Sequence, residues 1–192
     1  MLWPLELPVK ITFAILLALV LLATIGAVRL KWAPRKTFVI ASLIAFIGYI
    51  PSCTMVMQFV DARRFGVFEY TSYNEVQDFR IERFLPPTAR DITLEKTFMG
   101  HRAKYTITET ELRKYLDGLW EASGKKSSIP RSDLKDGEPG NRNEIETVIE
   151  GLNWPKMNES VQFHSPVESD GGGATYYFDP TSGVTYHRAA YW

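Results

Sequence analysis

The chain has 192 residues, with 22 basic and 22 acidic side chains and therefore no formal net charge. The charges are unevenly divided: residues 1–60 hold five basic side chains and one acid, which leaves 17 basic and 21 acidic residues for 61–192. The weakly acidic C-terminal part lacks the clustered lysine and arginine that nucleic-acid binding requires, so we exclude nucleic acid as a partner. The only cysteine is Cys53, which excludes an intrachain disulfide.

Two apolar runs near the N-terminus predict a transmembrane hairpin. Residues 11–28 contain no charged side chain, and neither do residues 38–60. At a rise of about 1.5 Å per residue these runs match a hydrocarbon core of roughly 30 Å, and we predict helices over about 9–30 and 38–60. The loop between them, 29–37, contains four of the five basic residues of this region. The positive-inside rule then predicts a multi-pass protein of the cell (inner) membrane, with its C-terminal domain on the extracytoplasmic side.

A cleaved secretory signal over residues 1 to about 27 is an alternative interpretation of the first run. It places the C-terminal domain on the same side of the membrane. Glu6 and two prolines make a poor basic n-region, however, and no clear small-x-small cleavage site follows the apolar core. The pattern favours the hairpin over 1–60.

The region after Asp61 changes to the hydrophobic period of strands. Alternating apolar residues predict two half-buried strands, over 92–98 and 103–107, around a short turn at Met99 and Gly100. Residues 65–84 contain further strand-like pieces and stop at Leu85-Pro86-Pro87, so one or two more strands are expected there.

Two helices are predicted in the middle of this region. Thr108 and Glu111 have the spacing of a capping box, and an apolar stripe with helical period follows them: Leu112, Tyr115, Leu116, Leu119 and Trp120. A shorter helix begins at Asn143 as cap. The segment 123–142 between the helices has no apolar period and is expected to be a mobile loop.

The last third returns to strands, expected over 161–163, 174–178 and 184–191. Asp179, Pro180 and Gly183 form a turn between the last two, because Asp and Pro favour its start and Gly tolerates a left-handed conformation. The order of elements predicts that 61–192 is one α+β domain, a mainly antiparallel sheet with two helices on one face.

Histidines give little indication of a catalytic or metal site. His101, His164 and His187 lie in no metal-binding spacing, and we expect neither a metal nor another cofactor. His101 and His187 each stand beside an arginine on a predicted strand and are expected at the solvent-exposed edge. If the fold joined them to Asp179, the chain would be a small extracytoplasmic hydrolase-like enzyme with acid/base chemistry, and this is the alternative function.

Aromatic residues crowd the final hairpin and favour a different role. Terminal strands often lie at accessible sheet edges, so Tyr186 and Trp192 are the candidate partner-binding residues. The sequence therefore favours a membrane-tethered interaction module, or an accessory subunit of a membrane assembly, with a protein partner and without catalysis. A pocket that holds an acid against a histidine would favour the enzyme instead.

Overall fold

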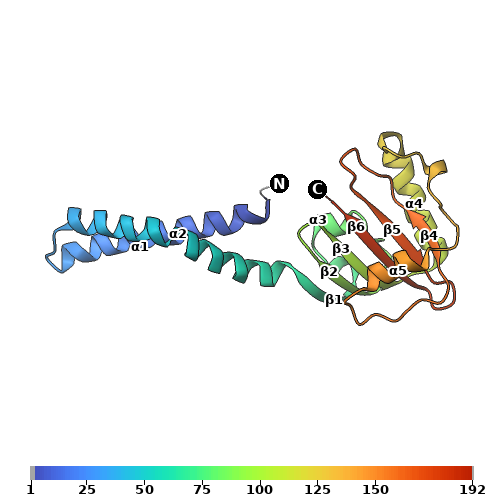
Figure 1. Cartoon of the computed structure of the whole chain (residues 1–192), viewed down its shortest axis with the longest axis horizontal. Helices are drawn as coiled ribbons and strands as arrows, with labels where there is room; N and C mark the ends of the chain where they lie inside the picture. The colour runs from blue at the N-terminus through green and yellow to red at the C-terminus, as the bar shows by residue number, and fades with distance from the viewer. Residues whose placement is uncertain (1–2, 192) are drawn as a thin grey trace. The chain divides into compact units, whose positions relative to one another are not determined.

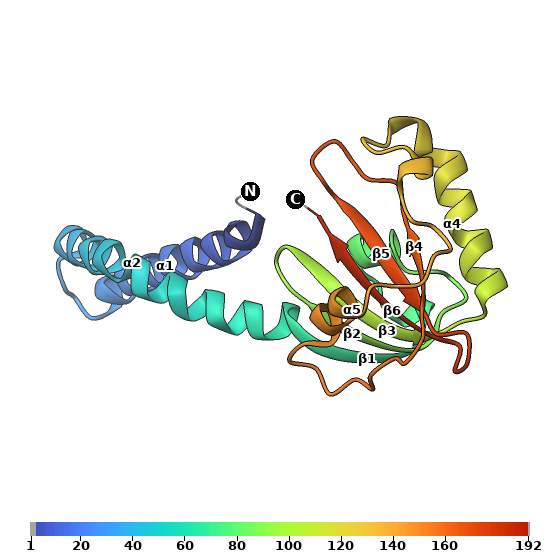
Figure 2. The same cartoon turned by 45° about the vertical axis from the view of Figure 1, so that its right-hand side comes forward.

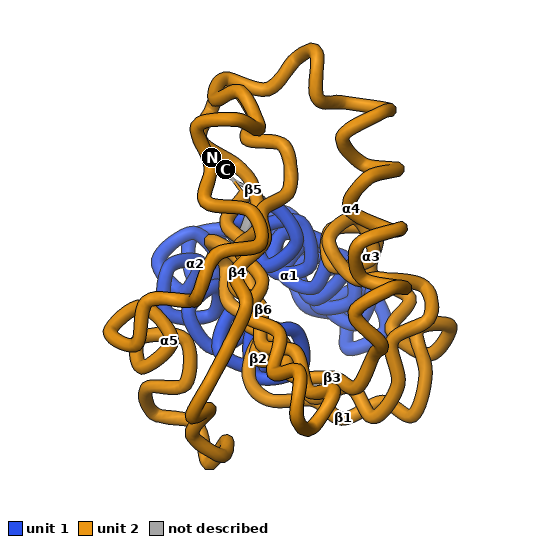
Figure 3. The backbone as a smooth tube through the Cα atoms, turned by 90° about the vertical axis from the view of Figure 1, so that its right-hand side faces the viewer, with its two compact units in different colours: residues 1–64 blue, residues 65–192 orange. Residues whose placement is uncertain are grey.

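The computed structural model describes residues 3–191 and divides into two compact units, residues 1–64 and 65–192 (Figure 3). The first unit is a hairpin of two helices, α1 (Trp3–Arg29) and α2 (Pro34–Arg64) (Figure 1). Both helices are long and apolar enough to cross a membrane. No residue of α2 is buried, and many of its large apolar side chains are exposed, among them Phe46 and Ile47.

The connection between α1 and α2 is shorter than the predicted loop over 29–37. Only residues 30–33 separate the two helices, and Arg35 and Lys36 belong to the first turn of α2. Pro34 explains the early start, because its fixed φ suits the first helical position and its missing amide proton costs nothing there. At the other end, α2 continues past the predicted residue 60 to Arg64.

The second unit contains a six-stranded antiparallel sheet, which confirms the predicted α+β class. The strands are β1 (Gly66–Ser72), β2 (Arg90–Lys96), β3 (Gly100–Thr106), β4 (Val161–His164), β5 (Gly173–Phe178) and β6 (Val184–Ala190). Their spatial order is β1-β2-β3-β6-β5-β4 (Figure 1). The last strand in sequence, β6, therefore lies inside the sheet, and β1 and β4 form its edges.

Three α-helices accompany the sheet: α3 (Phe79–Glu82), α4 (Glu109–Ser123) and α5 (Arg142–Ile149). There are also three short 3-10 helices, η1 (Tyr73–Glu75), η2 (Gly124–Lys126) and η3 (Arg131–Asp133). The predicted capping box of Thr108 and Glu111 is present at the start of α4. The cap of α5 is Asn141 rather than the predicted Asn143, whose backbone amide donates to the Asn141 side chain.

The prediction that both helices cover one face of the sheet is wrong, because α4 and α5 lie on opposite faces (Figure 2). Leu112 and Leu116 of α4 belong to a core with Tyr176 of β5. Ile145 and Val148 of α5 belong to a separate core, together with the neighbouring ring of Tyr177 and others. Successive side chains of a strand point to opposite faces, so the consecutive aromatic residues of β5 give the sheet two apolar faces and each needs its own cover.

The segment 123–142 is fastened to the domain, in contrast to the mobile loop that was predicted. The Ser128 amide donates to the Val167 carbonyl at 2.8 Å, and the Gly137 amide donates to the Gln162 carbonyl at 2.8 Å. The Arg131 guanidinium binds the carboxylates of Asp117 and Asp136. Such long-range polar partners leave no periodic pattern in a sequence.

Candidate functional site

His101 and His187 lie together in the core, and the prediction that they are solvent-edge residues is wrong. They come from adjacent strands, with His101 opposite Ala189 and His187 opposite Ala103, so the two imidazoles meet diagonally across the β3–β6 pair. Their Nε2 atoms are 2.7 Å apart, and both residues are at most 2% exposed. This distance requires one imidazole to donate a hydrogen bond and the other to accept it.

The environment keeps both imidazoles of the pair neutral. Burial lowers the pKa of His101 to about 3, and the Lys96 ammonium adds to this shift. Burial also holds the pKa of His187 well below its usual range, with a further contribution from His101. The His187 Nδ1 lies 3.3 Å from the Tyr105 hydroxyl, whereas the His101 Nδ1 has no hydrogen-bond partner among residues 3–191. Because burial both excludes solvent from the pair and lowers its pKa values, neither imidazole is suited to take a proton from a substrate.

Asp179 does not join the histidine pair. Its carboxylate accepts hydrogen bonds from the Thr181 amide at 2.8 Å and from the Ser182 hydroxyl at 2.8 Å, so it is occupied in closing the β5–β6 turn. His187 lies opposite Tyr176, three residues before Asp179 on the neighbouring strand, or about 10 Å along it. Of the predicted acid/base group, the structure thus brings His101 and His187 together and leaves Asp179 apart from them.

Tyr186 is buried, so the expectation that it presents an exposed ring is also wrong. It is 1% exposed, its ring stacks on Trp154 with centroids 5.4 Å apart, and its hydroxyl donates to the Pro155 carbonyl at 2.6 Å. The reason is the strand order, because β6 lies between β3 and β5 and the segment after α5 covers this part of it. Trp192, the second predicted partner-binding residue, lies outside the described residues.

The third histidine, His164 on β4, pairs with an acid beside a cavity. Its Nδ1 lies 3.1 Å from Asp136 Oδ1, and its Nε2 lies 3.0 Å from the Gln162 amide nitrogen. The cavity has a volume of about 320 Å³, and His164 and Gln162 line it together with acidic and amide side chains, including Glu138 and Glu144. Sequence reasoning missed this pair because 28 residues separate its members and no motif surrounds either one.

The surroundings of the pair indicate a mainly structural role. Asp136 Oδ1 also accepts the backbone amide of His164 at 2.8 Å, and Asp136 Oδ2 accepts from Arg131 Nε at 2.9 Å. Although burial raises the pKa of Asp136, these hydrogen bonds outweigh it and hold the pKa below its usual value. The described lining residues of the cavity include no serine, threonine or cysteine, so none of them supplies a hydroxyl or thiol nucleophile.

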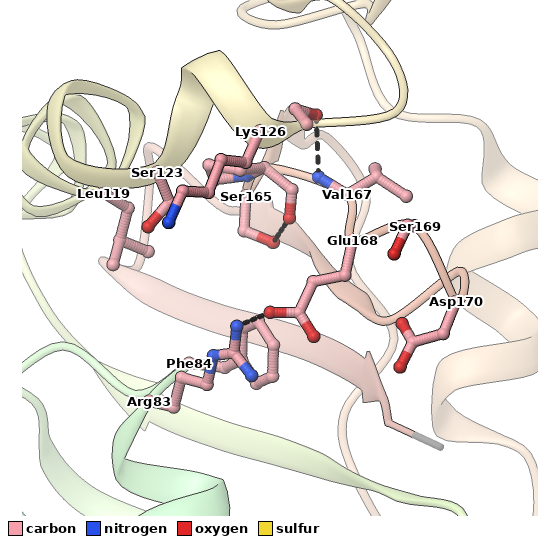
Figure 4. Close-up of a pocket in the computed structure, with 12 residues that line it drawn as sticks. Arg83, Phe84, Leu119, Ser123, Lys126, Ser165, Val167, Glu168, Ser169 and Asp170 are labelled. Carbon is pink, nitrogen blue, oxygen red and sulfur yellow. Dashed lines mark hydrogen bonds and ion pairs between the residues drawn. The ribbon is translucent and has the colours of Figure 1, made fainter.

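A polar cleft of about 370 Å³ lies between the end of α4 and residues 165–170 (Figure 4). An ion pair between Arg83 and Glu168 crosses it, as the dashed line in Figure 4 shows. Two of its serine hydroxyls bind the backbone: Ser165 Oγ accepts the Ala174 amide at 2.8 Å, and Ser127 Oγ accepts the Val167 amide at 3.0 Å. Ser127 and Ser165 thus hold the loop over residues 165–174 in place.

The two edges of the sheet differ in how they are covered. Beside β4, the segment 137–140 forms two backbone hydrogen bonds with Gln162. The Gly137 amide donates to the Gln162 carbonyl at 2.8 Å, and the Gln162 amide donates to the Glu138 carbonyl at 2.9 Å. Beside β1, no strand among residues 3–191 pairs with the outer side. This seven-residue edge contains neither proline nor lysine, the residues that commonly block unwanted pairing at sheet edges.

The direction of the backbone groups along β1 follows from one contact. The Thr71 amide donates to the Glu75 side chain at 3.0 Å and therefore points away from β2. Amide direction alternates along a strand in an antiparallel pair, so the Glu69 and Val67 amides also face outward. Their side chains are exposed, whereas those of Phe68 and Tyr70 are half-buried. The β1 edge, residues 66–72, thus directs the amides of Val67 and Glu69 outward toward another strand, whereas the outward amide of Thr71 is occupied by Glu75.

Comparison with known proteins adds no relative: the chain matches no family model, no curated protein and no solved structure.

Proposed function

We propose that the chain is a membrane-tethered interaction module whose β1 edge binds an extended strand of a protein partner. The observation that carries the proposal is the contrast between the two sheet edges: residues 137–140 cap one edge, and no strand of residues 3–191 pairs with the other. An added strand gains main-chain hydrogen bonds along β1. The rings of Phe68 and Tyr70 are half-buried and hold β1 against the rest of the domain.

The tether is the hairpin of α1 and α2. Both helices pass the length and hydropathy requirements for a span, and the second buries none of its residues, as expected of a surface that lipid covers. Basic residues lie in the connection between α1 and α2 or next to it, including Lys31 and Lys36. They support a cytoplasmic connection, with the hairpin in the cell (inner) membrane. Residues 65–192 then lie on the extracytoplasmic side.

Cysteine labelling in intact cells tests the tether. In a Cys53→Ser background, an impermeant maleimide should label Ser132→Cys and should leave Lys36→Cys unlabelled until the cells are permeabilised. Both positions are exposed, so a difference between them reports the side of the membrane. Labelling at Lys36→Cys alone would invert the orientation, and equal labelling of both in intact cells would contradict a spanning hairpin.

A proline substitution tests the binding edge. Glu69→Pro removes an outward amide and leaves the hydrogen bonds between β1 and β2 intact, since edge strands tolerate proline on their free side. Glu69→Ala is the matched control, because it removes the carboxylate but keeps the amide. Co-purification of the partner in mild detergent should be lost with Glu69→Pro and retained with Glu69→Ala, at an unchanged melting temperature. Equal recovery by both variants would contradict the strand-addition proposal.

A second candidate function, an acid/base enzyme, rests on the pair of His164 and Asp136 beside the cavity. Asp136 orients the imidazole, and His164 would activate a water molecule on a small polar substrate. His164→Gln distinguishes the two functions, since it removes the base and is compatible with partner binding at β1. Loss of the cellular role with full partner recovery and an unchanged melting temperature would favour the enzyme over the module.

A further inference from the structure

Exposed apolar side chains of the second unit gather at one end of the sheet. Residues 65–191 expose five large apolar side chains, Val67, Phe79, Phe98, Met99 and Ile129. The first four lie at the end where β1 begins, and only Ile129 lies elsewhere. We define the sheet-end patch as Val67, Phe79, Phe98 and Met99.

Strand register places three of the four residues at this end. Gly66 lies opposite Lys96, and Lys96 lies opposite His101, so the start of β1 and the β2–β3 turn at 97–99 share one end of the sheet (Figure 2). Thr97 closes that turn through its amide, which donates to the Gly100 carbonyl at 2.9 Å. The turn therefore holds Phe98 and Met99 in an exposed position, 59% and 40% accessible.

The fourth residue, Phe79, is brought to the same end by α3. Asp78, which caps α3, binds Lys96 at 3.5 Å, and the Arg80 guanidinium lies 6.0 Å from the centroid of the Tyr191 ring. Phe79 lies between Asp78 and Arg80 in the sequence, and its side chain is 76% exposed. The nearby cations Lys96 and Arg80 both have partners within the domain, so the patch is apolar rather than basic.

Chain connectivity limits how far this end of the sheet can lie from the end of α2. Only Phe65 separates the last residue of α2 from the first residue of β1. Two peptide units span at most about 7 Å, so the sheet end stays close to the end of α2 whatever angle the two units adopt. Rings and thioethers beside a membrane span are stabilised in the interfacial layer, where their apolar surface leaves water.

We infer that the sheet-end patch inserts into the headgroup region of the bilayer that holds the hairpin. This inference rests on the proposed membrane tether but not on the proposed protein partner. Insertion would fix the domain against the bilayer and orient the β1 edge along the membrane surface. A strand-adding partner would then be one that presents its segment close to the same membrane.

Depth-dependent fluorescence quenching in vesicles tests the inference with the full chain. In a Cys53→Ser background, an environment-sensitive NBD label is placed at Met99→Cys, Ile129→Cys or Ile47→Cys. Met99 and Ile129 are matched in exposure, at 40% and 39%, and both are apolar loop residues of the second unit. Ile47 lies in α2 and reports the span itself. The vesicles are phosphatidylcholine, with and without doxyl-labelled lipid.

The expected result is a blue-shifted Met99 label that doxyl lipid quenches, at a depth of about 5–10 Å in the headgroup region, with an Ile129 label that remains in water. Phe98→Asp should return the Met99 label to water and leave the Ile47 label quenched. A Met99 label that behaves like the Ile129 label, while the Ile47 label is quenched, would overturn the inference and leave the tether intact. An unquenched Ile47 label would refute the tether and the inference with it.

Discussion

The buried pair of His101 and His187 predicts that the second unit loses stability at mildly acidic pH. An unfolded histidine has a pKa of about 6.5. In the folded state the pKa of His101 is about 3, and that of His187 is also well below its usual range. Between these values the unfolded chain binds more protons than the folded chain, so the free energy of unfolding decreases as pH falls. The loss begins near pH 6.5 and continues towards pH 3.

Its magnitude at pH 5.0 follows from the difference in pKa. At 1.5 pH units below its pKa, protonation of one imidazole in the unfolded chain lowers the free energy of unfolding by about 2 kcal/mol. Two independent histidines lower it by about 4 kcal/mol. The pKa of Asp136 lies below its usual value, so the effect of this carboxylate on stability is expected only below about pH 4.

Urea unfolding of the full chain in a mild nonionic detergent, followed by tryptophan fluorescence, measures this loss. Trp120 and Trp154 both lie within the second unit and report its unfolding. The control replaces both histidines with glutamine, which keeps a polar pair but removes the titration. The difference in stability between pH 7.5 and pH 5.0 should be about 4 kcal/mol smaller in the control. An equal pH dependence in both proteins would refute the reasoning and would indicate that the pair binds a proton while buried.

Three further predictions concern the packing of the second unit. Leu116→Ala should lower the free energy of unfolding by about 2–5 kcal/mol in the same urea assay, because Leu116 is fully buried in the core under α4; a loss below about 1 kcal/mol would contradict this packing. Arg102→Lys should lower the free energy of unfolding by about 1–3 kcal/mol, because Arg102 binds Glu95 through two nitrogens and also donates to the Glu150 carbonyl, after α5, at 2.7 Å. The control is Lys156→Ala, which removes only an exposed ion pair and should lower the free energy of unfolding by less than about 1 kcal/mol. Residues 65–192 expressed alone should be soluble and unfold cooperatively on heating, because their two cores lie within this unit; an insoluble or non-cooperative product would mean that the hairpin or a partner completes the fold.

Local patterns were sufficient to predict much of the second unit. Thr108 and Glu111 begin α4 through contacts within one turn, and the apolar stripe after them is the stripe that the structure buries. The strands around residues 92–107 and 161–191 were likewise predicted from alternation and turn residues. The α+β class follows from these elements, since their order along the chain limits how they can associate.

The candidate site depends on contacts between distant residues and was therefore not predictable in the same way. Alternation indicates that Tyr186 lies on a strand but not whether that strand is central or at an edge, because the strand order is set by all six strands together. His101 and His187 meet only because β3 pairs with β6 in one register, across 86 positions. The principle that an edge strand offers unpaired backbone groups applies to β1 instead of the terminal strand.

Site-specific photocrosslinking at the β1 edge tests the central claim most directly. A benzophenone amino acid is placed at Glu69 or at Ser132, both exposed positions of the full chain, and intact cells are irradiated. The proposal predicts a single crosslinked adduct of defined mass from position 69 and none from position 132. It also predicts that Val67→Pro, which removes a neighbouring outward amide, abolishes the adduct. Absence of an adduct at position 69, or the same adducts from both positions, would contradict binding at the β1 edge.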